Sequence, residues 1–298
     1  MPLYLLLPVV AAVVYALGSI VIKRALRDGV GMDQSFHLAN VVLGLAFLPL
    51  LFVGIGKVDW GLLWKPLVMG TTFFVAHWLT FAAIRRGDVS LVTPLMGTKV
   101  VFVALGVVVL TGGMPSRPLW IAAFLTTLGI FTMGLADLKG GSHFLFTVAV
   151  ALASAAVFGV SDVLVAGWAE GFGAMPFLAV GSGTVALWTI VMWLCQGRPA
   201  FFPRGLGAKW AWAGAGFIAL QAMILGIALA LFDDATGINV VYTSRGLWAI
   251  ALVVVFGRFL GNSEHRDTGR AFLWRVAGTL LLTVAIVIAV VDRARAVG

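Results

Sequence analysis

Two cationic residues, Lys99 and Arg245, lie inside long apolar stretches of the sequence. At 1.5 Å per helical residue, Lys99 is about 15 Å from the start of its stretch, near the centre of a bilayer, and Arg245 is at a similar depth. A cation there is costly unless it faces a partner or a water-filled cavity. We interpret the pair as a site for an anionic group, a carboxylate or phosphate. The alternative is that a buried acid neutralises each cation and merely holds helices together.

Asp162 is the acidic residue best placed to neutralise one of these cations. It lies about 9 Å from the predicted end of its apolar stretch. Three roles stay open for its carboxylate: an ion pair with Arg245 or Lys99, uptake of a proton during coupling, or simple hydration at the membrane interface.

His77 and Gln221 are polar residues in two further apolar stretches. Phe residues surround His77 at helical spacing, which favours a neutral imidazole bonded to a neighbouring helix over one that titrates. Gln221, near the middle of its stretch, is either a cavity-lining residue or a hydrogen-bonding link between helices.

Aromatic residues flank Arg245 along the sequence. Tyr242 precedes it by one helical turn and Trp248 follows it by one turn, so we expect the three to share a face. Tyr15 and Asn239 are further hydrogen-bonding candidates, although Tyr and Trp also serve as ordinary packing residues. The candidate substrate-binding set is Lys99, Arg245, Tyr242, Gln221, His77, Tyr15, Trp248 and Asn239, with Asp162 as a coupling acid or ion-pair partner.

Catalytic and cofactor motifs are missing from the sequence. It contains no His-Glu-x-x-His, no Gly-x-Ser-x-Gly, no paired-carboxylate constellation suited to catalysis and no glycine loop between a strand and a helix. The one cysteine, Cys195, excludes a disulfide scaffold. We therefore expect no enzyme activity, no cofactor and no metal site.

The composition is that of a polytopic membrane protein. Of 298 residues, 61% are hydrophobic and 11% are charged, where a soluble domain has about 25% charged residues. The net charge of +8 comes from basic residues near the ends of apolar runs, where lipid head groups account for them. A lipid bilayer is thus an expected partner and nucleic acid is not.

The apolar runs predict an all-α protein with ten transmembrane helices, since about 20 apolar residues span a bilayer. The expected helices lie near 3–25, 34–56, 64–84, 89–111, 117–136, 144–168, 174–195, 208–232, 237–257 and 270–291.

The order of several short matches indicates an internal duplication of five helices. Sliding the segment 90–99 onto 236–245 pairs Lys99 with Arg245, and the segment 14–19 matches 157–162. We expect one repeat over residues 1–140 and a second over 141–298. An odd number of helices in each repeat inverts the second copy in the membrane, as in many secondary transporters.

Three segments carry a resemblance to a known family: Ala16–Arg24, Phe81–Gly87 and Lys99–Leu105. Through them the chain resembles the drug/metabolite transporter superfamily, in the branch built from two EamA-type five-helix repeats. The family usually has a Ser-Pro-Val-Phe-like stretch near position 99, where this sequence has a lysine. The resemblance implies a multi-pass protein of the plasma (bacterial inner) membrane, with the third, fourth, eighth and ninth helices lining a central cavity.

The function expected from the sequence is secondary-active transport of a small metabolite by alternating access, with an anionic group on the substrate. One alternative is a proton-coupled exporter of amino acids or lipophilic cations that uses Asp162. Another, from a different class, is a lipid-handling protein or a non-transporting membrane scaffold. Basic residues in the polar breaks favour external termini, whereas the family resemblance implies cytoplasmic ones, and both monomer and homodimer stay open.

Overall fold

The computed structural model describes residues 2–53, 58–86, 92, 95–134, 144–256 and 270–297. Across these residues every regular element is a helix. The longer helices are α1 (Leu6–Arg27), α2 (Met32–Phe47), α3 (Trp64–Arg86), α5 (Lys99–Gly106), α6 (Arg117–Gly134), α7 (Phe144–Phe172), α8 (Ala174–Cys195), α9 (Ala208–Leu231), α10 (Ala235–Tyr242), α11 (Arg245–Phe256) and α12 (Arg270–Val297). Short 3-10 or π turns extend α1, α2, α3 and α5.

The described helices are built to cross a membrane. Seven of them are long and apolar enough to do so, and two shorter apolar helices cover Lys99–Thr111 and Arg117–Thr132. Large apolar side chains such as Phe124 and Leu187 are exposed on the outside of the bundle. Apolar side chains on the outside of the bundle suit lipid as the surrounding solvent. A helix also satisfies its own backbone polar groups, as a segment within the bilayer must. The chain is therefore an integral multi-pass membrane protein.

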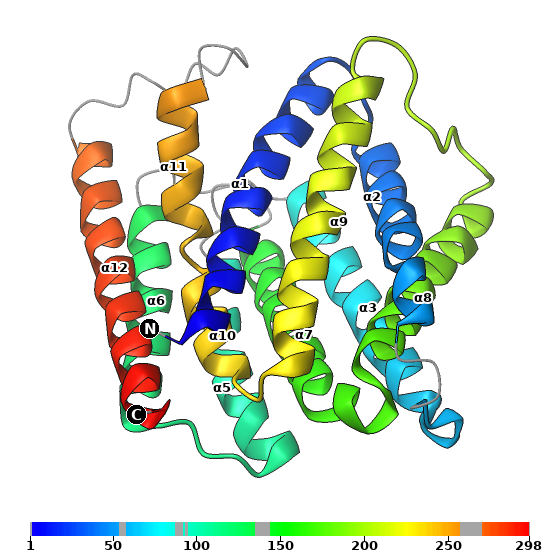
Figure 1. The fold of residues 1–298 in the computed structure, drawn as a ribbon. Coiled ribbons are helices and arrows are strands. Elements are labelled where there is room, and N and C mark those ends of the chain that lie inside the picture. The colour runs from blue at the N-terminus through cyan, green and yellow to red at the C-terminus, as the bar shows by residue number, and fades with distance from the viewer. Residues whose placement is uncertain are drawn as a thin grey trace.

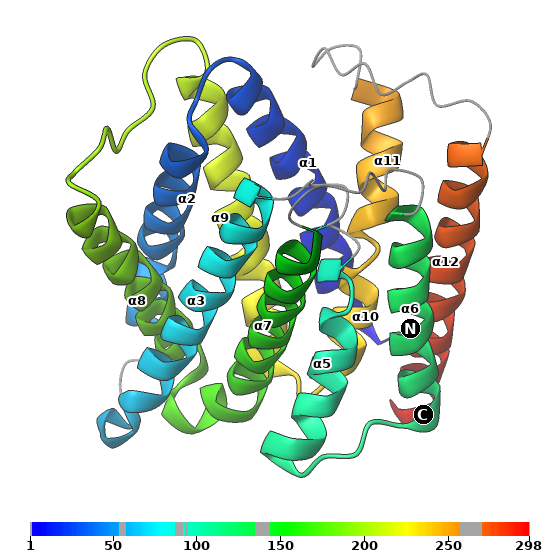
Figure 2. The same cartoon turned by 180° about the vertical axis from the view of Figure 1, so that it is seen from behind.

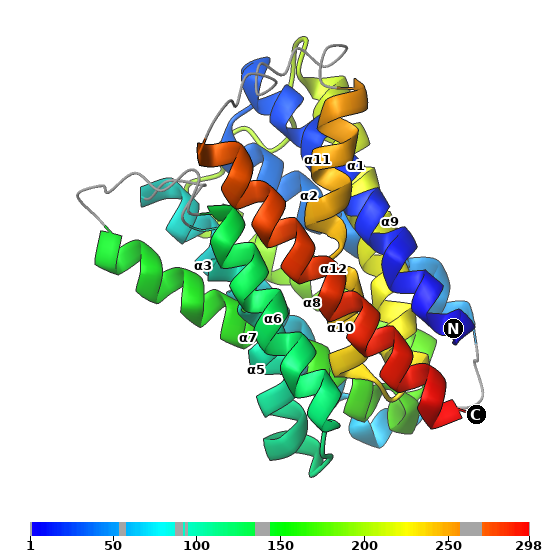
Figure 3. The ribbon, with the colours of Figure 1, turned by 90° about the vertical axis from the view of Figure 1, so that its left-hand side faces the viewer.

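The helices form one bundle with both termini at the same end (Figure 1). α1 packs along α9, and α3 packs along both α7 and α8, as the reverse view also shows (Figure 2). α6 and α12 lie against each other on one flank. Figure 3 looks onto this flank and shows the two helices side by side in front of the rest of the bundle.

Small residues let the central helices approach closely. Ala12 and Ala16 of α1 and Ala211 and Ala215 of α9 are almost completely buried. Packing of this kind holds membrane helices together, because lipid offers no hydrophobic driving force between them.

Asp234 ties three segments together at the end of the bundle where the termini lie. Its carboxylate accepts hydrogen bonds from the Tyr4 hydroxyl at 2.7 Å and from Arg293 at 2.6 Å. It also accepts the backbone N–H of Gly237 at 3.0 Å and so caps α10. The buried acid is therefore fully partnered and joins the start of the chain, α10 and α12.

The helix expected at 237–257 is broken in the structure. α10 ends at Tyr242, a turn follows at Thr243–Ser244, and α11 begins at Arg245. The Thr243 hydroxyl donates to the carbonyl of Val240, three residues back. Such a bond competes with the regular helical ladder, which periodicity alone does not reveal. The helix expected at 89–111 is likewise interrupted, by a turn at Gly97–Thr98 before α5, and residues 89–91 and 93–94 of that prediction lie outside the described residues. In contrast, α8 has the predicted bounds.

We predict that Gly70→Ala destabilises the protein by about 1–3 kcal/mol through overpacking. A Cβ at Gly70 would overlap the backbone carbonyl of Gly181 in α8 and lie 2.7 Å from the Cβ of Thr184. The matched control is Gly183→Ala, also at this level of α8, where a Cβ meets nothing within 4 Å. Thermal unfolding in detergent measures the difference, and equal melting temperatures for the two variants would contradict this account of the α3–α8 contact.

Candidate functional site

A cavity of about 230 Å³ lies between the helices of the bundle. Among the described residues, its wall comes from α1, α2, α3, α5, α7, α8, α9, α10 and α11 and from Met96, with no contribution from α6 or α12. Its polar wall residues are Tyr15, Asn40, His77, Thr80, Lys99, Ser161, Asp162, Ser182, Gln221, Tyr242 and Arg245. The helices expected to line a cavity therefore do so, together with α1, α2, α7 and α8.

Lys99 and Arg245 each occupy the first position of a helix that follows a turn. Lys99 begins α5 after the turn at Gly97–Thr98, and Arg245 begins α11 after Thr243–Ser244. The backbone bonds around the two turns match one for one: Thr98 to Leu95, Val101 to Thr98 and Phe102 to Thr98, against Ser244 to Val241, Leu247 to Ser244 and Trp248 to Ser244. Both cations thus lie beside the positive end of a helix dipole.

Lys99 is paired with an acid across the cavity wall. Its Nζ lies 2.6 Å from Oδ2 of Asp162 on α7, and both side chains are nearly buried, at 13% and 8% exposure. Nζ is also 5.8 Å from the ring centre of Phe158 and 6.0 Å from that of Tyr242. Of the two cations considered as partners for Asp162, Lys99 is the one in contact.

Arg245 is held by aromatic rings instead of an acid. Its Cζ lies 4.7 Å from the ring centre of Tyr15 and 4.9 Å from that of Tyr242. Its Nη1 donates a long bond of 3.5 Å to the Tyr242 hydroxyl, which itself donates to Gln221 at 2.6 Å. No carboxylate of the described residues lies within 4 Å of its guanidinium. This guanidinium is therefore an available cation in the cavity wall.

His77 belongs to a polar chain that links α3, α2 and α8. Its Nδ1 is 2.8 Å from Oδ1 of Asn40, and the Asn40 amide donates to the Thr189 hydroxyl at 3.0 Å. With the amide so oriented, Nδ1 carries the proton and Nε2 is the acceptor of the imidazole. The rings of Phe73 and Phe158 lie against the imidazole at 5.8 and 6.1 Å.

Two residues of the candidate set lie away from the cavity. Trp248 is 39% exposed and is not in the cavity wall, so it does not share the inward face of Tyr242 and Arg245. The turn at Thr243–Ser244 resets the helical register, which the expectation of one continuous helix did not include. Asn239 is buried and its amide donates to the carbonyl of Ala235. The other candidates, Lys99, Arg245, Tyr242, Gln221, His77, Tyr15 and Asp162, all line the cavity.

Asn40 and Phe158 are cavity residues that the sequence reasoning did not select as site residues. Asn40 carried a usable signal, since a polar amide inside an apolar stretch is the same feature that singled out Gln221. For Phe158 the only feature in the sequence was its alignment with Tyr15 in the match between the two halves. Its contact with Lys99 depends on how α7 packs against α5.

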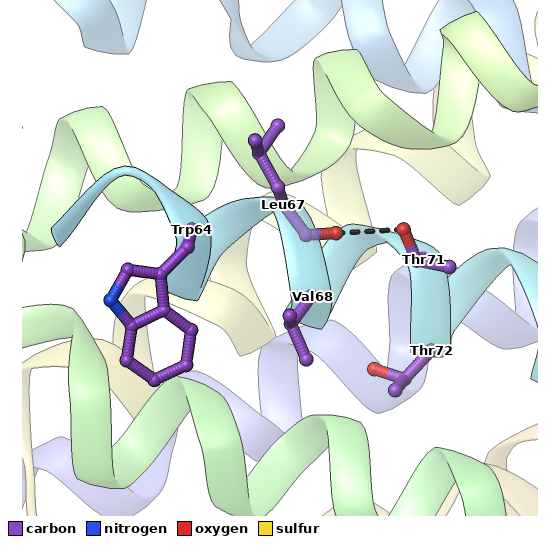
Figure 4. A pocket seen from close by; sticks show the side chains of 5 residues that line it. All are labelled: Trp64, Leu67, Val68, Thr71 and Thr72. Carbon is purple, nitrogen blue, oxygen red and sulfur yellow. Dashed lines mark hydrogen bonds between the residues drawn. The ribbon is translucent and has the colours of Figure 1, made fainter.

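A second hollow, of about 310 Å³, lies on the outer surface of α3 and is shown in Figure 4. Trp64, Leu67, Val68, Thr71 and Thr72 line it, and the Thr71 hydroxyl donates to the carbonyl of Leu67 at 2.8 Å (Figure 4). It is open and apolar and its wall has no charged side chain, so we assign it to the lipid-facing surface. Over the described chain, no cluster of three or more His, Cys, Asp or Glu residues is arranged to hold a metal ion.

Comparison with known proteins gives a family match for residues 2–135. Residues 2–135 match the model of the EamA-like transporter family. No curated protein matches the sequence. A solved crystal structure superposes on 98% of this chain and 98% of its own with a TM-score of 0.77, and at 15% identity this likeness concerns the fold alone. The resemblance expected from the sequence is thus confirmed for residues 2–135, which are similar to the EamA-like transporter family of the drug/metabolite transporter superfamily.

Proposed function

We propose that this membrane protein is a secondary transporter that moves a small anionic metabolite by alternating access. The observation that carries the proposal is the central cavity whose wall holds Lys99 and Arg245 at two helix breaks. Broken helices whose N-terminal ends face a substrate are a recurring way of binding anions within membranes. Two basic side chains beside two such ends provide a positive site in a low-dielectric surrounding, where it attracts anions strongly.

The proposed architecture is ten membrane spans in two inverted repeats, residues 1–140 and 141–298. Packing partners support it, because exchanging helices for their counterparts in the other half reproduces several of the most extensive contacts. The contact of α1 with α9 corresponds to α7 with α3, that of α2 with α9 to α8 with α3, and that of α5 with α7 to α11 with α1. The matched backbone bonds at the two breaks support the same assignment. Movement of one repeat against the other would expose the cavity to each side in turn.

The proposed energy source is exchange or an ion gradient, and the proposed location is the plasma membrane, the inner membrane in a bacterium. Asp162 favours a second candidate within transport, a proton-coupled exporter of amino acids or lipophilic cations, because its carboxylate lines the cavity. The ion pair with Lys99 favours the anion site, since the acid is already matched by a cation.

Thermal stabilisation of the detergent-purified protein tests the proposal. Small carboxylates, phosphorylated metabolites, amino acids and organic cations form the panel, since a ligand at 100 times its Kd stabilises the folded state by about 2.7 kcal/mol. We expect anions to raise the melting temperature and then to drive counterflow in proteoliposomes. Stabilisation by organic cations alone would replace the anion site with the Asp162 candidate, and counterflow of no panel member despite binding would argue against transport.

A further inference from the structure

The charged side chains in the cavity wall do not balance. Among the described wall residues, only Lys99, Asp162 and Arg245 have charged side chains, which leaves one net positive charge. From this imbalance we infer that the transported substrate is a monocarboxylate with an apolar body. The inference rests on the proposed transport function and narrows its substrate class.

The imbalance arises from one difference between the two halves. In the match of residues 14–19 to 157–162, Tyr15 corresponds to Phe158. The Tyr15 ring lies against Arg245, and the Phe158 ring lies against Lys99. Asp162 then corresponds to Ser19, whose hydroxyl donates to the carbonyl of Tyr15 at 2.8 Å. The second half therefore supplies an acid to Lys99, and the first half supplies none to Arg245.

The net charge of the cavity selects against dianions. A monoanion at Arg245 brings the formal charges of the wall side chains and substrate to a sum of zero, whereas a dianion leaves one negative charge with no cationic side chain to match it in a nearly buried site. The desolvation of an uncompensated buried charge is costly. Phosphate monoesters have a second pKa near 6 and carry almost two charges at neutral pH, so this argument favours a carboxylate over a phosphate.

The rest of the wall describes the body of the substrate. Leu43, Phe47, Met69, Leu225 and Leu229 add apolar surface to the cavity. These side chains offer no hydrogen bonds to a substrate. The polar wall residues Asn40, His77, Thr80, Ser182 and Gln221 already hydrogen-bond within the protein, so a hydrocarbon or aromatic body fits the cavity best. The cavity volume of about 230 Å³ limits the ligand to a small molecule.

Succinate and monomethyl succinate test the inference, because they share a carbon skeleton and differ by one charge at pH 7.5. For the full-length protein in detergent we expect the monoester to bind more tightly by about tenfold or more. Asp162→Asn raises the wall charge to two, so the ratio of the two affinities should shift toward succinate by a similar factor. The double variant Lys99→Gln/Asp162→Asn returns the wall to one positive charge, and the ratio should move back toward the monoester.

Each result decides a different question. Equal binding of the two ligands, or tighter binding of succinate, by the unaltered protein overturns the monocarboxylate inference even if Asp162→Asn fails to fold. An affinity ratio that Asp162→Asn leaves unchanged also overturns it, because the charge balance would not be the cause. If the monoester binds preferentially but does not undergo counterflow in proteoliposomes, the transport proposal fails while the charge preference of the cavity stands.

Discussion

Replacing Arg245 with Ala is expected to abolish anion-dependent stabilisation and transport while leaving a folded protein in the membrane. The guanidinium packs between Tyr15 and Tyr242 and has no acidic partner among the described residues. Removal of the guanidinium therefore leaves no buried carboxylate without its ion-pair partner. What is lost is the cation that a substrate carboxylate would pair with, together with a planar group suited to bind it at two points.

The expected loss at Arg245 is large because the pair would form away from water. Truncating one partner of a buried hydrogen-bonded charge pair costs about 2–5 kcal/mol, so Kd should rise by about 30-fold or more. Arg204→Ala is the matched control, since Arg204 is an exposed cation outside the cavity wall. Arg245→Lys should bind more tightly than Arg245→Ala because it keeps the charge. Wild-type affinity in Arg245→Ala would remove this residue from the site.

Replacing Lys99 with Ala is expected to destabilise the protein by about 3–5 kcal/mol, in contrast to the change at Arg245. Lys99 and Asp162 form a nearly buried pair at 2.6 Å, and removal of the lysine leaves the carboxylate without its cation. Thermal or denaturant unfolding in detergent measures the loss.

The double variant Lys99→Ala/Asp162→Asn separates the ion pair from the packing of the lysine stem. Once the acid is gone, most of the lost stability should return, because no uncompensated charge remains. If the single Lys99→Ala variant has the same melting temperature as the unaltered protein, the ion pair contributes nothing to the stability of the fold. If the double variant is no more stable than the single one, the damage comes from the cavity that the lysine stem leaves.

These two predictions assign different roles to Lys99 and Arg245, which look equivalent in the sequence. Lys99 and Arg245 are predicted at similar depths, and each lies at the start of a helix that follows a turn. Their partners distinguish them, since Lys99 has a carboxylate and Arg245 has two phenol rings. In our proposal Lys99 holds α5 to α7 and neutralises Asp162, while Arg245 binds the substrate.

Membrane insertion and helical structure were predictable from the sequence, because both depend on local properties. An apolar run of about 20 residues spans a bilayer as a helix whatever its neighbours are. The same reasoning identified several polar residues of the cavity wall, since a charge or amide such as Lys99 or Gln221 inside such a run needs a polar surrounding. The sequence alone thus determined the class of protein, the resemblance to the EamA-like transporter family that residues 2–135 bear out, and the polar residues most worth examining.

The tertiary structure decided which of these residues meet. Asp162 had two candidate cations, and only the packing of α7 against α5 brings it to Lys99. The turn at Thr243–Ser244 separates Trp248 from the inward face, because a local hydroxyl–carbonyl bond interrupts a segment that the sequence predicts as one continuous helix. Hydropathy reports how each segment partitions between water and lipid, but the pairing of charges depends on contacts between distant segments. The single unmatched positive charge of the cavity is therefore a property of the fold.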